Sequence, residues 1–253
     1  MSRRLGQHFL HPHAVRRLVE LLGPTPAEHF LEIGAGAGAL TLPLAAHAGH
    51  VTAVEVDPVL VARLRARAPH NLTVVRGDAL AIDLEALAPP ATRLCGNLPY
   101  YISSPLLRRF LSLRHRLRDA HVMLQEEVAR RVASPPGSKE YGILSVLFAL
   151  WAEVDIPLLF PPSDFEPPPK VSSSLLRVRF RREPQADIAD LEAFETLLKR
   201  AFAQRRRTLE NNLRVSYPNL KDHLKLLNIE GSRRAETLSV VEFGRLYQAL
   251  VVQ

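Results

Sequence analysis

The sequence predicts an α/β protein: a Rossmann-like, seven-stranded, mostly parallel sheet with helices, followed by a small all-helical domain. Short apolar runs alternate with helix-like stretches through the first part of the 253 residues, as in repeated βαβ units. A glycine-rich turn, Gly34-Ala35-Gly36-Ala37-Gly38, joins the first of these runs to a helix-like stretch. Beyond Arg181-Arg182 the pattern is helical, so we expect two domains, residues 1–182 and 183–253.

The first half of the chain opens with a helix over residues 12–22. Pro12 suits its first position, where an N–H would be unpaired in any case, and Gly23 suits its end. Apolar runs then predict strands over 29–33, 51–56, 72–76 and 93–96. Helix-like stretches cover 39–46, 58–66 and 103–113, and Pro58 marks the start of the second.

The second half begins with a strand over 121–124 and helices over 126–132 and 143–151. Two final strands are expected over 153–156 and 174–180. The loop between them is rich in proline, and such a stiff loop loses little entropy when it holds a side chain in place. The C-terminal domain should contain helices over 191–204, 208–213, 220–227 and 240–252.

Composition limits the kinds of protein that the chain can be. A hydrophobic content of 47% and a charged content of 23% are ordinary for a globular protein with a sizeable core. The single Cys95 excludes an internal disulfide, and the histidines show no metal-ligand spacing, so we expect no metal. The N-terminus lacks the apolar core of a signal peptide, and no run approaches the ~18 apolar residues of a membrane span. We therefore expect a cytoplasmic monomer without a membrane partner.

The stretch Asn97-Leu98-Pro99-Tyr100 follows a predicted strand, at the end where open α/β sheets bind ligands. These residue types suit a flat base that carries an exocyclic amine. The amide oxygen of Asn97 and a backbone carbonyl in the Leu98-Pro99 turn can each accept one N–H, and Tyr100 offers a ring for stacking. Phe165, in the proline-rich loop, would cover the other face of a flipped base. The stretch therefore indicates an amino-methyltransferase, although Asn and Pro are also common in ordinary turns.

The glycine turn indicates a nucleotide cofactor, because Gly34 and Gly36 let the backbone approach a ligand closely. Glu55 lies 21 residues after Gly34 and ends the next strand, where a carboxylate can accept both ribose hydroxyls. NAD would fit these features as well. Three features favour S-adenosylmethionine: Glu32 beside the expected ammonium or sulfonium end, Asp78 near the adenine amine, and the stretch that begins at Asn97.

A net charge of +7 favours a nucleic-acid partner where the charge is clustered. The clearest cluster is Arg205-Arg206-Arg207, followed by Asn211-Asn212. In a helix, Arg205 and Asn212 would share a face with Thr208 and Leu209. We interpret the run as an RNA-binding surface formed by Arg205, Arg206, Arg207 and Asn212. A solvated basic helix and a packing role are the alternatives.

Together these motifs resemble the small-subunit (16S) ribosomal RNA adenine N6,N6-dimethyltransferase family, the one associated with kasugamycin sensitivity. The matching pieces follow in family order along nearly the whole chain: Gln7-His8-Phe9-Leu10, 31–38, 54–57, 77–79, 97–100, 141–146, 165–171 and 202–213. The resemblance implies a class I S-adenosylmethionine-dependent methyltransferase. It would add two methyl groups to each of two adjacent adenines in the 3′-terminal hairpin of small-subunit RNA, on a pre-30S particle during ribosome assembly.

The resemblance also implies a cofactor site lined by His8, Leu10, Gly34, Glu55, Asp78 and Asn97. Two positions depart from the family pattern, which usually has Asn at His8 and often Arg at Ile143. Two other functions stay open at this point. One is an NAD-dependent oxidoreductase on the same fold, and the other is a non-enzymatic RNA-binding assembly or transcription factor that keeps the fold.

Overall fold

The computed structural model of the chain describes residues 8–252, so Gln7 of the first matching motif lies outside the described residues. The chain forms two compact units. The first, which we call the sheet unit, runs to Ala129 and resumes over Asp155–Phe180. The second, which we call the helical unit, comprises Arg130–Val154 and the chain from Arg181 on. The predicted functional division at residues 182 and 183 stays a prediction; by contacts, residues 130–154 belong with the C-terminal helices.

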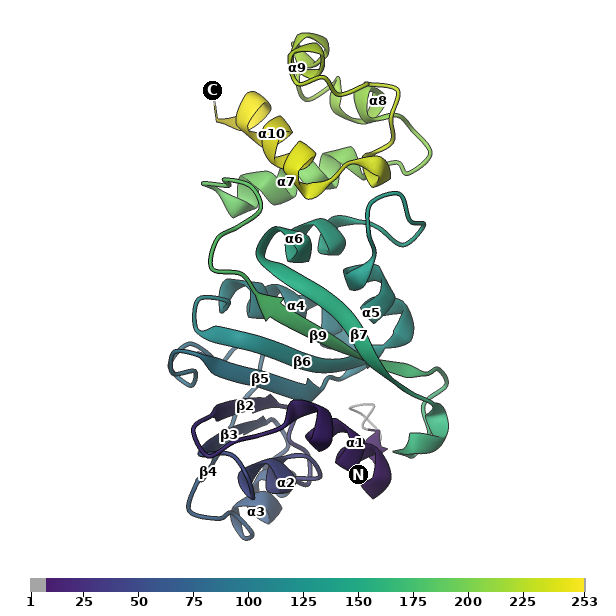
Figure 1. Cartoon of the computed structure of the whole chain (residues 1–253). Helices are drawn as coiled ribbons and strands as arrows, with labels where there is room; N and C mark the ends of the chain where they lie inside the picture. The colour runs from purple at the N-terminus through teal and green to yellow at the C-terminus, as the bar shows by residue number, and fades with distance from the viewer. Residues whose placement is uncertain (1–7, 253) are drawn as a thin grey trace. The chain divides into compact units, whose positions relative to one another are not determined.

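A seven-stranded sheet has the strand order β4-β3-β2-β5-β6-β9-β7 (Figure 1). The pairs β3–β4, β2–β3, β2–β5 and β5–β6 are parallel, and β6 pairs with β9 antiparallel. The predicted seven-stranded, mostly parallel sheet is therefore confirmed. Its strands are β2 (His29–Ile33), β3 (His50–Glu55), β4 (Leu72–Arg76), β5 (Thr92–Asn97), β6 (Leu117–Gln125), β7 (Ala152–Phe160) and β9 (Ser173–Phe180).

Two strands are longer than their apolar runs predict. β6 begins at Leu117 rather than at 121, because Arg118 and Asp119 interrupt the apolar pattern without interrupting the strand. β7 continues through Pro157 to Phe160. Proline has no N–H to donate, and β7 is an edge strand of the sheet, where that donor is not needed.

The helices up to residue 133 lie close to their predicted positions. They are α1 (Pro12–Leu22), α2 (Thr41–Ala45), α3 (Pro58–Arg65), a 3₁₀ turn (Tyr100–Ile102), α4 (Ser103–Ser112) and α5 (Glu126–Ala133). The α1 helix ends as predicted, because Gly23 adopts a left-handed conformation with φ of +52° and its N–H caps the Val19 carbonyl. The α2 helix is shorter than the 39–46 stretch predicts.

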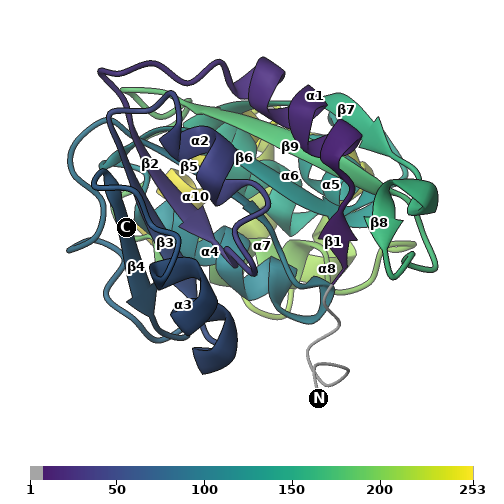
Figure 2. The same cartoon turned by 90° about the horizontal axis from the view of Figure 1, so that it is seen from below.

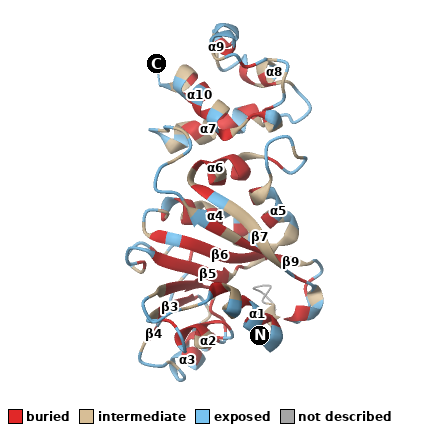
Figure 3. Ribbon diagram, in the orientation of Figure 1, coloured by how far each residue is buried: buried red, intermediate tan, exposed pale blue. Residues whose placement is uncertain are grey.

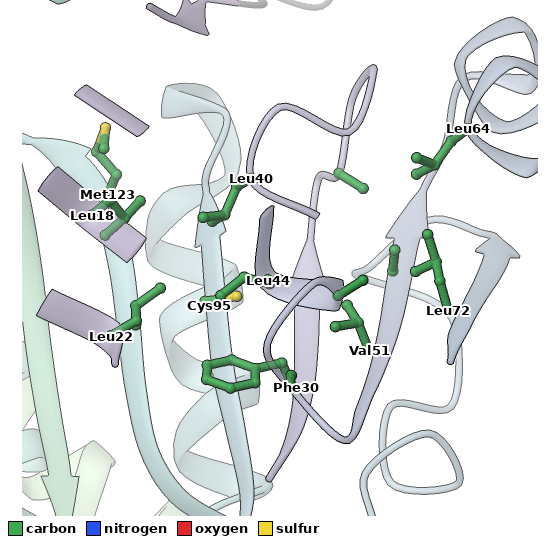
Figure 4. Packing of buried hydrophobic residues seen from close by; sticks show 14 of the residues in the cluster. Leu18, Leu22, Phe30, Leu40, Leu44, Val51, Leu64, Leu72, Cys95 and Met123 are labelled. Carbon is green, nitrogen blue, oxygen red and sulfur yellow. The ribbon is translucent and has the colours of Figure 1, made fainter. Parts of the chain in front are cut away.

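Apolar side chains of α1 and α2 pack on one face of the sheet. Figure 4 shows Leu18 and Leu22 of α1 and Leu44 of α2 around Phe30 and Cys95. Figure 3 shows how completely the central strands are covered, since β5 is buried up to its last residue. Burial raises the pKa of the Cys95 thiol, so this group stays protonated and packs as a small apolar side chain.

A second, two-stranded sheet was not predicted. β1 (Phe9–Leu10) pairs antiparallel with β8 (Phe165–Glu166), and the two lie side by side in Figure 2. A buried carboxylate holds the pair in place: Asp164 contacts Nε2 of His13 at 2.8 Å and Nη1 of Arg17 at 3.3 Å. The N-terminal segment is therefore tied to the proline-rich loop.

The helical unit contains α6 (Ile143–Trp151), α7 (Leu191–Ala201), α8 (Leu209–Leu213), α9 (Leu220–Leu226) and α10 (Val240–Val251). Almost every residue of α6 is apolar, and it packs against α7 and α10. Phe194 and Tyr247 join α7 to α10 through an edge-to-face contact with ring centroids 5.7 Å apart. Within residues 8–252, no helix is both long enough and apolar enough to cross a membrane.

A buried cation organises the amino-terminal edge of the sheet. Arg93 is 6% exposed; its Nη1 donates to the Leu22 carbonyl at 2.7 Å and its Nε to Asp119 at 3.1 Å. Glu28 accepts a further bond from Nη1 at 3.2 Å. One guanidinium therefore joins α1, β5 and β6.

We predict that Arg93→Ala lowers the free energy of unfolding by about 3 kcal/mol, because the buried Asp119 carboxylate loses the guanidinium that pairs with it. Glu28 keeps its bond from Arg118 at 2.8 Å. The matched control is Arg177→Ala, which breaks the pair with Asp155, whose side chains are 32% and 38% exposed. That variant should lose less than about 1 kcal/mol. Urea unfolding measures both, and equal losses would contradict the central role of Arg93.

Candidate active site

A cavity of about 420 Å³ opens at the carboxyl ends of β2, β3, β4 and β5. Its walls include the residues that the sequence predicts for the cofactor and for the base. The structure brings together His8, Leu10, Gly34, Gly36, Glu55, Asp78, Asn97, Leu98, Pro99 and Tyr100. Of the residues predicted for the two sites, only Phe165 does not line this cavity.

The glycine turn forms one wall. Gly34 and Gly36 have φ of +77° and +57°, a left-handed conformation that side chains rarely adopt. A Cβ added at Gly36 would lie 3.2 Å from the ring of Phe9, which also lines the cavity. Glycine at these positions therefore leaves room for both the N-terminal segment and a ligand.

Glu55 is held rigidly at the end of β3. Its Oε2 accepts the Gly36 N–H at 2.7 Å, and its Oε1 accepts the N–H groups of Val56 and Asp57, each at 2.9 Å. A carboxylate has about four acceptor positions, and three are used, so this buried group can still accept from one hydroxyl, at Oε2. Asp78, by contrast, is exposed at the rim of the cavity, where its Oδ1 accepts the Leu80 N–H at 2.9 Å.

Glu32 is the unusual carboxyl group of the cavity. It is 2% exposed, and no donor from the described part of the chain reaches its Oε2. Burial raises the pKa of Glu32 to about 8, and the nearby charge of Glu55 adds to the rise. A buried carboxyl oxygen without a partner is costly in a folded protein, and a cationic ligand in the cavity would supply a partner for Oε2.

Asn97 ends β5 where that strand approaches β2 most closely. A Cβ at Gly96 would lie 2.3 Å from the Ile33 carbonyl oxygen, so only glycine allows this approach. The Asn97 Nδ2 donates to the His8 carbonyl at 2.8 Å. Because a carbonyl can only accept, this bond fixes which way round the amide lies and leaves Oδ1 as an acceptor for a ligand.

Tyr100 presents a ring to the cavity and fixes it through its hydroxyl. The Tyr100 hydroxyl and the Ser173 hydroxyl lie 2.7 Å apart, at hydrogen-bonding distance. Burial raises the pKa of Tyr100, so the phenol stays neutral and does not act as a base near pH 7. Its ring is stacked on the imidazole of His8, with centroids 5.7 Å apart and an interplanar angle of 25°.

The structure does not bring Phe165 to the position that the sequence predicts for it. Its side chain is 1% exposed and belongs to the apolar cluster beneath α1, because β8 pairs with Leu10 and turns the ring inward. Sequence reasoning missed Tyr101, which lines the cavity and is 64% exposed. The two consecutive tyrosines, Tyr100 and Tyr101, were the feature of the sequence that could have indicated this second aromatic residue.

In the helical unit, Arg205, Arg206 and Arg207 lie in a turn between two helices, as the predicted helices over 191–204 and 208–213 imply. α7 ends at Ala201 and α8 begins at Leu209, so Arg205 and Asn212 do not share a helical face. Arg205 donates to the Lys139 carbonyl and pairs with Glu236 at 3.7 Å.

Asn212 also has structural partners, because its Nδ2 donates to the carbonyls of Ala201 and Gln204 at 2.7 and 3.1 Å. Arg206 and Arg207 are both exposed. Of the four residues predicted to bind RNA, these two therefore present the more accessible charge.

Comparison with known proteins gives consistent results. A family model described as ribosomal RNA adenine dimethylase matches residues 1–251. "Ribosomal RNA small subunit methyltransferase A" of Xylella fastidiosa (strain 9a5c) is 42% identical over 255 residues, covering 98% of this chain and 95% of the relative. The protein of the same name from Magnetococcus marinus is 42% identical over 251 residues, covering 97% and 90%.

Two solved structures share the fold over nearly their whole length. The 23S rRNA methyltransferase ErmE gives a TM-score of 0.73 at 27% identity, covering 96% of this chain and 99% of that one. A dimethyladenosine transferase from Plasmodium falciparum gives 0.80 at 24% identity, covering 94% and 96%.

Proposed function

The chain belongs to the ribosomal RNA adenine dimethylase family, and from that premise we propose what its cavity does. It transfers methyl groups from S-adenosylmethionine to N6 of two adjacent adenines in the 3′-terminal hairpin of small-subunit ribosomal RNA, giving N6,N6-dimethyladenosines. The fold is the predicted class I methyltransferase fold. Membership of this family also decides against the NAD-dependent oxidoreductase that the glycine turn alone left open.

The partner is ribosomal RNA. We propose further that the enzyme meets it as a monomer, on a pre-30S particle in the cytoplasm. A role in assembly beyond catalysis is compatible with this proposal, because one RNA-binding surface serves both.

The cavity fits the cofactor in its charges as well as its position. The Oε2 atom of Glu32, which no donor reaches within the described residues, suits the ammonium group, and the fixed Glu55 carboxylate suits a ribose hydroxyl. The turn at Gly34 leaves room for the part of the cofactor between these two groups. Asp78 at the rim suits the adenine amine. When bound, S-adenosylmethionine supplies an electrophilic methyl group on its sulfonium.

The single observation that carries the proposal is the orientation of the Asn97 amide. With Nδ2 held by the His8 carbonyl, Oδ1 is the atom left to accept an N–H of the target adenine amine. A backbone carbonyl of the Leu98-Pro99 turn would accept the second N–H. Two acceptors at fixed positions orient the nitrogen lone pair, and such positioning accounts for much of catalysis in methyl transfer without a strong base.

The same arrangement explains how two methyl groups can be added and the product released. After the first transfer the amine keeps one N–H, which a single acceptor can still hold. The dimethylated amine has no N–H, so neither acceptor can bind it. The Asn97 amide cannot take a proton itself, and the proton leaves the amine for solvent once the new C–N bond has formed.

We predict that Asn97→Ala lowers kcat by about 10²–10³-fold, as expected for removal of an oriented hydrogen-bonding group at the reacting atom. Affinity for S-adenosylmethionine should change much less. The assay transfers tritiated methyl groups to unmethylated small subunits and then identifies the modified nucleoside. Unimpaired turnover of the variant would refute the role of Asn97, and a product other than dimethyladenosine would refute the proposed reaction.

We predict that cofactor binding releases a proton through Glu32. With its pKa raised to about 8, this carboxyl is mostly protonated in the free protein at pH 7, and a bound ammonium favours the ionised form. Affinity should therefore rise as pH increases toward 8 and level off above it. Titration calorimetry at pH 7, in buffers of different ionisation enthalpy, should show about one proton released. Glu32→Gln is the control, and equal release by both proteins would exclude Glu32 as the source.

We also propose that Arg206 and Arg207 contact the RNA backbone. Their joint replacement by Ala should weaken binding and reduce the slope of log K against log salt by about 1.8, as for two lost phosphate contacts. Arg205→Ala, which breaks contacts within the helical unit, should lower the free energy of unfolding and leave the slope unchanged. The reverse pattern would assign the RNA contact to Arg205.

A further inference from the structure

The His8 side chain makes two contacts that the proposed reaction does not require. Its Nδ1 lies 2.7 Å from the Pro167 carbonyl oxygen, and since a carbonyl only accepts, Nδ1 carries the hydrogen. Its ring is stacked on Tyr100, with centroids 5.7 Å apart. The imidazole is therefore placed by the proline-rich loop on one side and by the Tyr100 ring on the other.

The stacked position matters because both rings line the cavity. A purine stacks on an aromatic ring at about the same range of centroid distances as an imidazole does. The face of Tyr100 that His8 covers is thus of the size and chemistry that a flipped adenine needs. Phe165, the other aromatic predicted for the base, is buried in the apolar cluster.

We propose that His8 is a gate: its imidazole occupies the Tyr100 face that the target adenine takes up, and the base displaces it on binding. This inference rests on the proposed adenine methylation. It assigns to His8 a role toward the RNA substrate in place of the cofactor contact that the family resemblance implies.

The backbone around His8 allows the ring to move without loosening the segment. The His8 carbonyl is bonded to Asn97 at 2.8 Å, and Phe9 and Leu10 pair with Glu166 and Phe165. His11 adds a backbone bond to the Asp164 carbonyl at 2.8 Å. The ring itself is half-buried, and its polar and stacking contacts within residues 8–252 are those to Pro167 and Tyr100. Rotation of the side chain therefore breaks two contacts and leaves the Asn97 amide in place.

Two substitutions test the contribution of the His8 ring separately from that of its hydrogen bond. His8→Asn removes the ring and keeps an N–H donor near the Pro167 carbonyl, whereas His8→Phe keeps a stacking ring and removes the donor. A gate predicts that His8→Asn lowers KM for unmethylated small subunits by about threefold to tenfold, the range expected for an aromatic pair. His8→Phe should leave this KM closer to the wild-type value than His8→Asn does, since its ring still competes for Tyr100. The Kd for S-adenosylmethionine should stay the same in both variants.

Other outcomes would overturn the gate. An unchanged KM for His8→Asn means that the ring does not compete with the base, and a raised KM means that His8 helps to hold the base. A higher Kd for S-adenosylmethionine in both variants would mean that His8 contacts the cofactor, as the family resemblance implies. The free energy of unfolding of each variant controls for damage to the segment. If the wild-type enzyme forms no dimethyladenosine, the proposed reaction fails instead, and the two failures are told apart in the same assay.

Discussion

The close approach of β5 to β2 is the constraint on which the site depends. At Gly96 the two strands come so near that a Cβ would lie 2.3 Å from the Ile33 carbonyl oxygen. Parallel pairing then brings their carboxyl ends to one edge of the sheet, with the Asn97 carbonyl beside Gly34. β3 also pairs parallel with β2, so its last residue, Glu55, lies at the same edge. The glycine turn, the carboxylate proposed to bind the ribose and the amide are thus neighbours because of strand register rather than sequence proximity.

The N-terminal segment completes this site from outside the large sheet. Its pairing with the proline-rich loop carries the His8 carbonyl to the Asn97 amide and the His8 ring to Tyr100. In the proposed reaction the segment acts on the substrate in two ways, through a backbone carbonyl that orients the Asn97 amide and through a side chain that is stacked on Tyr100. Only the second of these can be changed by a side-chain substitution.

Much of the fold could be predicted from local patterns, because α1 carries its own end signals at Pro12 and Gly23 and each central strand contains a short apolar run. The edge of the sheet that carries the site could be predicted from the residues at which those runs end. The β1–β8 pair could not be predicted, since two residues on each side give no pattern and the partners lie far apart in the chain. For the same reason Phe165 was predicted as a base contact, whereas the structure buries it in the core. The helical face that Arg205 and Asn212 would share does not form, because α7 ends at Ala201 and charge alone does not reveal that end.

The most direct test of the account is a crystal structure of the enzyme with S-adenosylhomocysteine and an RNA hairpin that carries the target adenines. The account predicts that the flipped adenine lies on Tyr100 with N6 about 3 Å from Asn97 Oδ1, while Nδ2 still donates to the His8 carbonyl. An adenine bound elsewhere, or an Asn97 amide turned away from it, would contradict the account.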